Sequence, residues 1–178
     1  YQSRRMIRLR NAQFSDYAAI AKLHTDNWKE TYRGILSDHY LDYEIDKDRL
    51  DTWYKRLQSP PNNQFITIAM SDDLMAGFCC VYLNENPHYG SLIDNLHVAP
   101  AFQRSGIGKM LVKDSARYIC EKADNKKMYL WVFEANRNAR IAYQHMGGAN
   151  VETVDKENPD GTISRTCRIF WSDASKFF

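Results

Sequence analysis

The spacing of hydrophobic residues changes several times along the chain, and each change predicts a new element. Residues 6–10 (MIRLR) alternate between hydrophobic and polar, which is typical of a strand. From Tyr17 onward hydrophobic residues recur at every third or fourth position, as on one face of a helix that ends at Gly34. A second helix is expected over residues 38–57, and the prolines and asparagines of residues 59–63 end it.

Strand-like and helical segments alternate through the rest of the chain. Six further strands are expected at residues 65–70, 77–83, 92–98, 128–133, 151–154 and 162–171. Helical spacing is found over residues 111–123 and 136–146. The last two strands would form a hairpin around Asn158-Pro159-Asp160-Gly161. This order predicts an α/β (α+β) fold, in which about four helices pack on one mixed sheet of about seven strands.

Composition narrows the class of protein. The chain of 178 residues has no internal repeat or linker, and we expect a single domain over residues 1–178, with residues 1–5 a tag or a disordered start before Met6. The net charge of +2 argues against nucleic acid as a partner. No hydrophobic run reaches the ~18 residues of a membrane span. Because the four cysteines lack zinc-site spacing, we expect no metal, free thiols and a cytoplasmic location.

One stretch, QRSGIGKML at residues 103–111, places two glycines between basic residues, after a predicted strand and at the start of a predicted helix. A P-loop requires glycine and Ser or Thr where this chain has Gln103 and Met110. The dinucleotide fingerprint requires a third glycine where this chain has Leu111, so nucleotide binding is disfavoured. Two interpretations remain: a cradle of backbone N–H groups that binds an anion, or a turn that only joins strand to helix.

Two motifs resemble those of one known family. Residues 103–108 (QRSGIG) resemble the Gln/Arg-x-x-Gly-x-Gly/Ala signature of the GNAT superfamily of N-acetyltransferases, and they follow a strand as that signature does. Downstream, Asn136, Ala139, Tyr143 and Gly147 resemble the family's Asn-x-x-Ala-x-x-x-Tyr-x-x-x-Gly pattern. The two motifs stand in the family's order and at its usual separation. Gly148 departs from the pattern, because the family more often has an aromatic residue there, and this affects the expected local packing.

The resemblance implies a fold, an activity and a cofactor. It implies a mostly antiparallel GNAT-like sheet, and transfer of an acetyl group from acetyl-CoA to a primary amine by direct attack through a tetrahedral intermediate. The backbone of the strand at residues 96–98 would pair with the pantetheine arm, and amides from about Gln103 to Lys109 would hold the pyrophosphate. The implied cofactor-binding residues are Leu96, His97, Val98, Gln103, Arg104, Ser105, Gly106, Ile107, Gly108, Lys109, Asn136, Ala139 and Tyr143.

The chemistry needs a proton donor for the leaving thiolate, and the resemblance places Tyr143 beside the sulfur. A phenol with a pKa near ~10 stays protonated at neutral pH, so Tyr143 is the candidate general acid. Asn136 could be a helix N-cap, a cofactor contact or both. A non-catalytic acyl-CoA-binding or regulatory module is the alternative, but such a module does not need the acid. The backbone N–H of Val98 or its neighbour would meet the carbonyl oxygen.

The general base is less defined. Asp94 and Glu85 are candidates, and strict strand alternation puts Asp94 on the same face as Leu96 and Val98. An exposed or hydrogen-bonded Asp94 is an equal alternative, and an amine that arrives neutral would need no base. By the same alternation His97 faces the other side, and we interpret its side chain and that of His145 as structural.

The acceptor side is expected on the helices that follow the first strand. Trp28 and Tyr32 are one helical turn apart and would wall the pocket or belong to the core. Glu30, or Asp38 with Asp42, would attract a cationic amine. The acceptor would be a small molecule or a peptide, and the C-terminal hairpin offers an edge for a homodimer.

Overall fold

Within residues 6–178 the strands form one sheet of seven, in the order β1-β2-β3-β4-β5-β7-β6. This computed structural model describes residues 6–178, so the expectation of a tag or disordered start at residues 1–5 lies outside the described residues. Neighbouring strands are antiparallel except β4 and β5. The strands are β1 (Ile7–Asn11), β2 (Gln64–Ser71), β3 (Leu74–Asn86), β4 (Gly90–Val98), β5 (Met128–Phe133), β6 (Ala149–Glu157) and β7 (Ile163–Trp171). The predicted mixed, mostly antiparallel sheet is confirmed.

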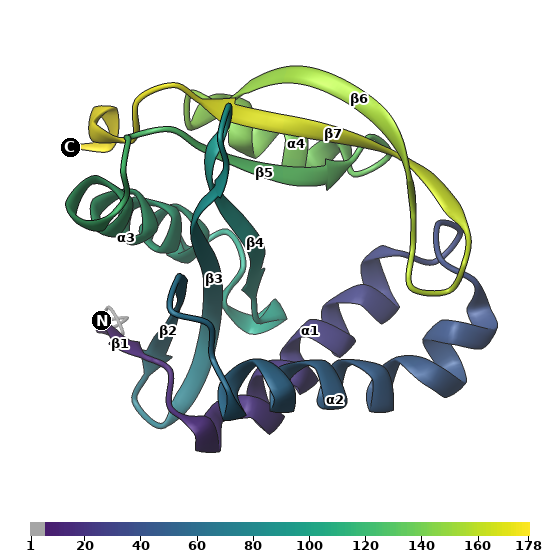
Figure 1. Cartoon of the computed structure of the whole chain (residues 1–178). Coiled ribbons are helices and arrows are strands. Elements are labelled where there is room, and N and C mark those ends of the chain that lie inside the picture. Colours follow the sequence, from purple (N-terminus) through teal and green to yellow (C-terminus); the bar gives the residue numbers. More distant parts are fainter. Residues whose placement is uncertain (1–5) are drawn as a thin grey trace.

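Four α-helices cover the two faces of this sheet (Figure 1). Helices α1 (Tyr17–Thr31) and α2 (Ile45–Gln58) pack on one face, and α3 (Ile107–Lys122) and α4 (Arg137–His145) pack on the other. The predicted helix at residues 38–57 is present, and within it Tyr40–Glu44 is π-helical before α2 begins. Both α1 and α2 place their hydrophobic stripes on the sheet, which is what amphipathic helices require.

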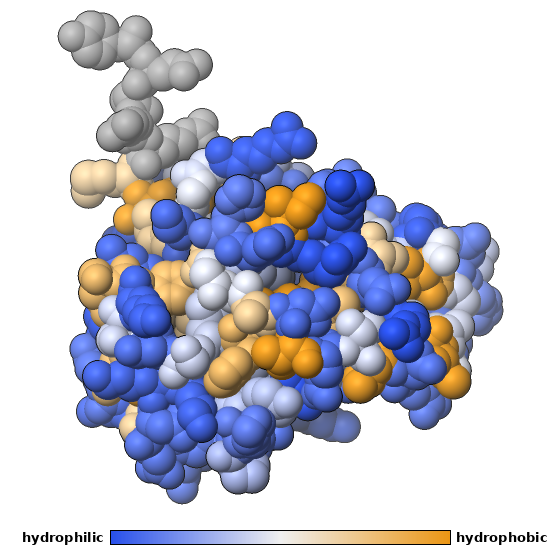
Figure 2. Space-filling view, turned by 90° about the horizontal axis from the view of Figure 1, so that it is seen from above, coloured by the Kyte–Doolittle hydropathy of each residue, from blue (hydrophilic) through white to orange (hydrophobic). Residues whose placement is uncertain are grey.

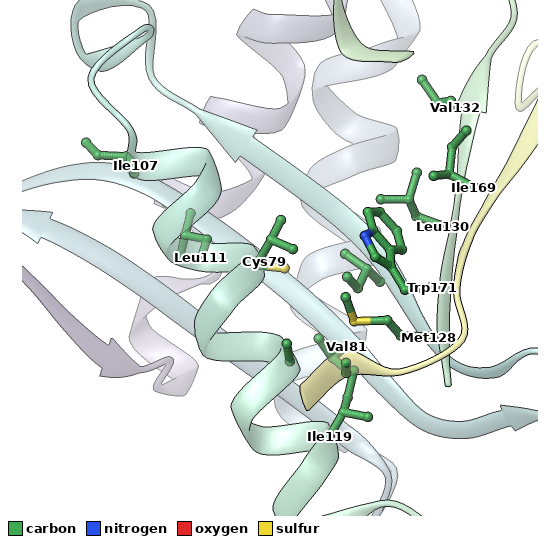
Figure 3. Packing of buried hydrophobic residues seen from close by; sticks show 14 of the residues in the cluster. Cys79, Val81, Ile107, Leu111, Ile119, Met128, Leu130, Val132, Ile169 and Trp171 are labelled. Atoms are coloured by element: carbon green, nitrogen blue, oxygen red, sulfur yellow. The ribbon is translucent and has the colours of Figure 1, made fainter. Parts of the chain in front are cut away.

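The two faces have separate hydrophobic cores. On the α3/α4 face Cys79, Val81, Leu111, Ile119 and Trp171 pack together with neighbours from β5 and β7 (Figure 3). On the α1/α2 face the buried residues include Ile20, Trp53, Phe78 and Cys80. Adjacent Cys79 and Cys80 therefore point to opposite faces of the sheet, and all four cysteines are free thiols. Burial raises the pKa of Cys79 to about 12, so this thiol is unreactive at neutral pH.

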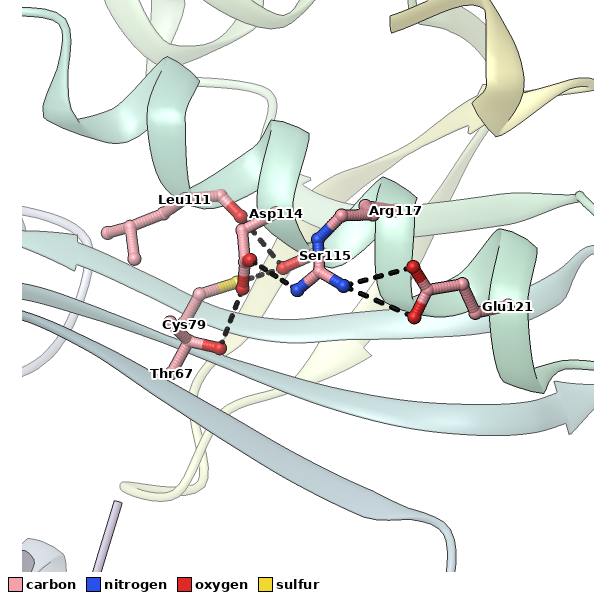
Figure 4. Close-up of polar contacts among 7 residues, drawn as sticks. All are labelled: Thr67, Cys79, Leu111, Asp114, Ser115, Arg117 and Glu121. Atoms are coloured by element: carbon pink, nitrogen blue, oxygen red, sulfur yellow. Dashed lines mark hydrogen bonds and ion pairs between the residues drawn. The ribbon is translucent and has the colours of Figure 1, made fainter. Parts of the chain in front are cut away.

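Polar contacts fix α3 on the sheet (Figure 4). Thr67 of β2 donates a hydrogen bond to Asp114 over 3.0 Å, and Asp114 pairs with Arg117 over 2.8 Å. Ser115 donates to the carbonyl oxygen of Leu111 over 2.9 Å, and its hydroxyl lies 3.3 Å from the sulfur of Cys79. These contacts hold the helix in register with β2 and β3, which places its first turn beside the end of β4.

The sheet opens in its middle. β4 and β5 pair only over Ser91–Ile93 and Met128–Leu130, and beyond these residues the two strands diverge. Figure 1 shows the ends of β4 and β5 running apart. One outer face, drawn in Figure 2, is mostly hydrophilic, with hydrophobic residues in small separate patches. Within residues 6–178 no helix is long and apolar enough to cross a membrane.

Candidate active site

The opening between β4 and β5 contains a cavity of about 270 Å³, which we call the channel. Leu96, Ala139 and Tyr143 line it from the α3/α4 side, and Trp28 and Trp131 line it from the α1/α2 side. The channel thus crosses the sheet from one face to the other. It brings together many of the residues that the sequence singled out: Trp28, Tyr32, Asp94, Leu96, His97, Gln103, Asn136, Ala139 and Tyr143.

The glycine stretch forms a turn at the start of α3, next to the channel. Gly106 caps the helix with a φ of 85°, and Arg104 has a φ of 63°, so the chain turns sharply here. Among residues 6–178, the backbone N–H groups of residues 104–109 donate to no protein acceptor. The first hydrogen bond of the helix is donated by the N–H of Met110 to the carbonyl oxygen of Gly106, over 3.0 Å. These free donors and the helix dipole make this turn a candidate anion site.

The surroundings of this anion site suit a negatively charged group. Ile107 is buried and anchors the turn, whereas Arg104, Ser105 and Lys109 are exposed. A Cβ atom added at Gly108 would contact only the side chain of Val98, at 3.7 Å, so the site adjoins the end of β4. The amides and the two basic residues therefore fit a phosphate that enters from solvent.

Tyr143 projects from α4 into the channel. Its ring packs edge-on against Trp171, with 6.2 Å between the ring centroids. Burial raises the pKa of Tyr143, and the nearby phenol of Tyr32 adds to this effect, so the hydroxyl stays protonated at neutral pH. Within the described residues this hydroxyl has no hydrogen-bond partner, which leaves it free to donate into the channel.

Two further positions of the second motif have local structural roles. Asn136 is the N-cap of α4, because its side-chain oxygen accepts the N–H of Ala139 over 3.3 Å. Gly148 is buried against Ile169 and Trp171, and an added Cβ would lie 2.5 Å and 2.8 Å from their side chains. Trp171 of β7 therefore fills the space that an aromatic residue at position 148 would need, which explains the departure from the family pattern.

Asp94 lies on the other face of the sheet from the one that alternation predicts. Val81 pairs with Ile93 but Cys80 pairs with Asn95, so Asp94 is an extra residue in a β-bulge. The bulge shifts the alternation by one residue. The expectation that Asp94 shares a face with Leu96 and Val98 is therefore wrong.

The bulge turns the carboxylate of Asp94 toward the α1/α2 face, where it lies 3.0 Å from the guanidinium of Arg56 and keeps 28% of its side chain exposed. There it borders the channel on the side of Trp28 and Trp131. The other candidate base, Glu85, does not line the channel, and it accepts a hydrogen bond from Asn63 over 3.3 Å.

A buried group of polar side chains holds α1 against β4. The ring of His97 packs on that of His24, with 4.5 Å between centroids, and Trp53 donates to Nδ1 of His24 over 3.0 Å. Asn27 donates to the carbonyl oxygen of Val98 over 3.1 Å and lies 3.3 Å from Nδ1 of His97. Burial lowers the pKa of both histidines, that of His97 to about 3, so both are neutral at pH 7.

The sequence did not identify His24 and Asn27 as part of this group. Both lie on the inward face of α1, whose sequence has the spacing of an ordinary amphipathic helix. Only the contact with β4 in the folded protein shows that they hold the helix against that strand. The face assigned to the side chain of His97 is confirmed, because it packs on Phe78 in the α1/α2 core.

Trp28 and Tyr32 form part of the wall and part of the core. Their rings are 5.4 Å apart, Tyr32 lies 4.7 Å from Phe133, and both residues also pack on the buried segment that precedes α2. Burial raises the pKa of Tyr32, although the adjacent side chain of Asn136 opposes the shift. The two residues thus line the channel and also pack in the core, and their contact with an acceptor stays a prediction.

The acidic residues expected to attract an amine are engaged elsewhere. Arg33 contacts Asp38 over 3.3 Å and Asp42 over 2.7 Å, so these two carboxylates are balanced by one cation. Neither residue lines the channel. Glu30 is exposed on the outside of α1 and does not line it either.

Comparisons with known proteins agree with this arrangement. A model of the acetyltransferase (GNAT) family matches residues 20–148. An uncharacterized N-acetyltransferase, YuaI, of Bacillus subtilis (strain 168) is 26% identical over 175 residues, which cover 96% of this chain and 95% of the relative. A spermidine N(1)-acetyltransferase of Thermoplasma acidophilum is 25% identical over 153 residues, which cover 84% and 91%. The crystal structure of Arabidopsis thaliana NAA60 in complex with acetyl-CoA has the same fold, with a TM-score of 0.70, 16% identity and coverage of 93% and 98%.

Proposed function

Because the chain belongs to the acetyltransferase (GNAT) family, we propose how its own residues support acetyl transfer from acetyl-CoA to a primary amine. The observation that carries the proposal is the junction of two features. The free backbone N–H groups of residues 104–109 lie beside the channel, and the phenol of Tyr143 lines that channel. A phosphate-bearing thioester suits the first feature, and a leaving thiolate suits the second.

The α3/α4 side of the sheet, which we call the cofactor side, would bind acetyl-CoA. Its pyrophosphate fits the free amides of residues 104–109, with Arg104 and Lys109 adding positive charge. β5 has diverged from β4 at Leu96–Val98, so this edge offers backbone groups to the pantetheine arm, except for the carbonyl oxygen of Val98, which accepts from Asn27 and Gln103. Gln103, Asn136 and Ala139 line the channel in positions to contact the same arm.

When bound, acetyl-CoA supplies the acetyl group as a thioester that an amine can attack directly. Tyr143 donates its proton to the departing sulfur, because its hydroxyl is protonated and has no other partner in the described part of the chain. The backbone N–H of Val98 stabilises the negative charge on the carbonyl oxygen, whereas the N–H of Ala99 is occupied by the carbonyl oxygen of Ala76 over 2.8 Å. Asp94 receives the amine's proton through water from the opposite side of the sheet.

The α1/α2 side, which we call the acceptor side, would admit the amine. Trp28, Tyr32 and Trp131 wall this end of the channel, and Asp94 borders it. The T. acidophilum relative is named for spermidine, a small-molecule amine, and the acceptor here is a small molecule or a peptide. The four free thiols favour a reducing, cytoplasmic location, and the edge strand β6 offers a surface for a second copy.

Thiol release from acetyl-CoA tests this function directly. We expect release that depends on both protein and amine, with the acetylated amine detected by mass spectrometry. Thermal melting with acetyl-CoA, CoA, ATP and NAD provides a second measurement, and acetyl-CoA and CoA should stabilise the protein. Stabilisation by acetyl-CoA without transfer to any amine would instead support a non-catalytic acyl-CoA-binding module, which the family relationship does not favour.

A further inference from the structure

Trp131 lines the acceptor end of the channel, and two cations that are not themselves lining residues lie on its ring. The Nζ atom of Lys156 is 3.7 Å from the ring centroid, and the Cζ atom of Arg168 is 4.1 Å from it. Strand pairing explains the position, because Trp131 of β5 is opposite Arg168 of β7, and Arg168 is opposite Glu152 of β6. Lys156 comes from the same face of β6 as Glu152, four residues further along, and reaches back to the ring.

The charges around this ring leave one cation without a counterion. Arg168 is paired with Glu152 over 2.5 Å, and Arg56 is paired with Asp94 over 3.0 Å. Among residues 6–178, no carboxylate lies within ion-pair distance of Lys156. Its ammonium group is half-buried, and burial and the charge of Arg168 lower its pKa, against the opposing effect of Asp94 and Glu152. A half-buried ammonium that contacts an aromatic ring but has no counterion favours an anionic ligand.

No surplus of negative charge is found at this end of the channel. Among the described residues that line the channel, Asp94 is the only carboxylate, and it is paired with Arg56. A polyamine, which carries only positive charge, would therefore meet Lys156 and Arg168 without a free acidic partner. The acceptor end selects against a second ammonium group and in favour of a carboxylate.

We propose that the acceptor is an amine that also carries a carboxylate, and that Lys156 binds this carboxylate while the amino group enters the channel past Trp131. The proposal rests on the proposed N-acetyltransferase function and adds the substrate class. Arg168 holds the ring of Trp131 from β7 and is itself held by Glu152, so Lys156 is the specificity-determining residue. The carboxylate belongs to a free amino acid or to an acidic peptide, which share the same chemistry.

Matched pairs of amines test the proposal. Tyrosine and tyramine, histidine and histamine, and lysine and 1,5-diaminopentane differ by one carboxylate, and the amidated tripeptides Ala-Glu-Ala and Ala-Gln-Ala differ in one acidic side chain. We expect a higher kcat/KM for the carboxylate-bearing member in at least one pair. The Lys156→Met variant should lower the ratio of the two kcat/KM values about 10- to 100-fold, as for loss of a hydrogen bond to a charged group.

Two control variants show whether the positive charge is responsible. Lys156→Arg keeps the charge and should retain the preference, and Lys55→Met removes an exposed lysine of α2 and should leave it unchanged. Thermal melting with acetyl-CoA verifies that each variant folds and binds. Equal or better use of the carboxylate-free members, or an unchanged ratio in Lys156→Met, would overturn the proposal and leave the acetyltransferase function standing. No transfer to any amine would contradict both.

Discussion

The two sides of the divided sheet offer different chemical groups to a ligand: backbone groups on one side and side chains on the other. The cofactor side presents backbone: free N–H groups at residues 104–109 from a single loop and helix start, and the unpaired edge of β4. The acceptor side presents side chains from α1, α2, β4, β5, β6 and β7, among them Trp28, Arg56, Asp94 and Lys156. A site made of backbone can bind one ligand in many sequences, whereas a site made of side chains changes its ligand with each substitution.

Tyr143 lies between the two sides, and replacing it should have the largest effect of any substitution considered for the site. Tyr143→Phe deletes the proton donor but keeps the ring that packs on Trp171. We expect turnover to fall by ~10²–10⁴-fold while acetyl-CoA affinity is largely kept, because the backbone cradle is untouched. Steady-state thiol release and calorimetric titration with acetyl-CoA measure the two quantities.

The control for this variant is Tyr118→Phe, which removes the hydroxyl of a tyrosine that stacks on Phe65 outside the channel. It should leave turnover unchanged. Near-wild-type turnover in Tyr143→Phe would remove this residue from the mechanism and make the acceptor side solely responsible for proton transfer.

Asp94 tests whether the acceptor side takes part in the chemistry or only in recognition. Asp94→Asn should lower kcat/KM about 10²-fold at pH 7, because most of the amine is then protonated and needs a base. The deficit should shrink as the pH approaches the pKa of the amine, since the acceptor then arrives neutral. The measurement is the pH profile of kcat/KM for both proteins.

Glu85→Gln is the matched control, because Glu85 is the other candidate base but lies outside the channel lining. Its profile should follow that of the unaltered protein. A deficit in Asp94→Asn that is equal at every pH would mean that Asp94 only holds Arg56 in place.

The same contrast explains what the sequence could predict. The element order follows from local spacing, and residues 128–133 were predicted as the strand with the bounds that the structure gives. The cradle is contiguous, so its glycines and its position before a helix are visible in the sequence. Asp94 was assigned to the wrong face because the β-bulge depends on the pairing of β4 with β3, which has no local signal. Lys156 and Asn27 were missed because their partners, Trp131 and Val98, are distant in sequence.

Replacing Gly108 should change the stability of the cofactor side and its affinity for acetyl-CoA in opposite directions. A Cβ at this position would meet only Val98, at 3.7 Å, so Gly108→Ala should stabilise α3 by roughly 0.5–1 kcal/mol. The same methyl group would obstruct an anion that approaches the amides. We expect acetyl-CoA affinity to fall about 10- to 100-fold, as for loss of a hydrogen bond to a charged group. Urea unfolding and calorimetric titration give the two values.

Gly106→Ala provides the opposite case, because its φ of 85° strains any other residue and should cost about 1–2 kcal/mol of stability. Unchanged acetyl-CoA affinity in Gly108→Ala would argue that the phosphate does not approach this turn.

The smallest expected effect is the loss of folding stability at low pH, which we expect to arise on the acceptor side, from His24. Its pKa is lowered by burial in the folded protein, so between pH 6.5 and 5 the unfolded chain binds a proton there that the folded chain does not. Stability is therefore full above pH 6.5 and falls with decreasing pH, by about 1.4 kcal/mol per pH unit for each such histidine. His24→Gln keeps an acceptor for Trp53, and it should reduce the pH dependence of the free energy of unfolding in urea by one proton. An unchanged slope would show that His24 does not titrate on unfolding. A reduced slope would show that the packing of α1 on β4, which also holds Asn27 against Val98, carries the acid sensitivity of the acceptor side.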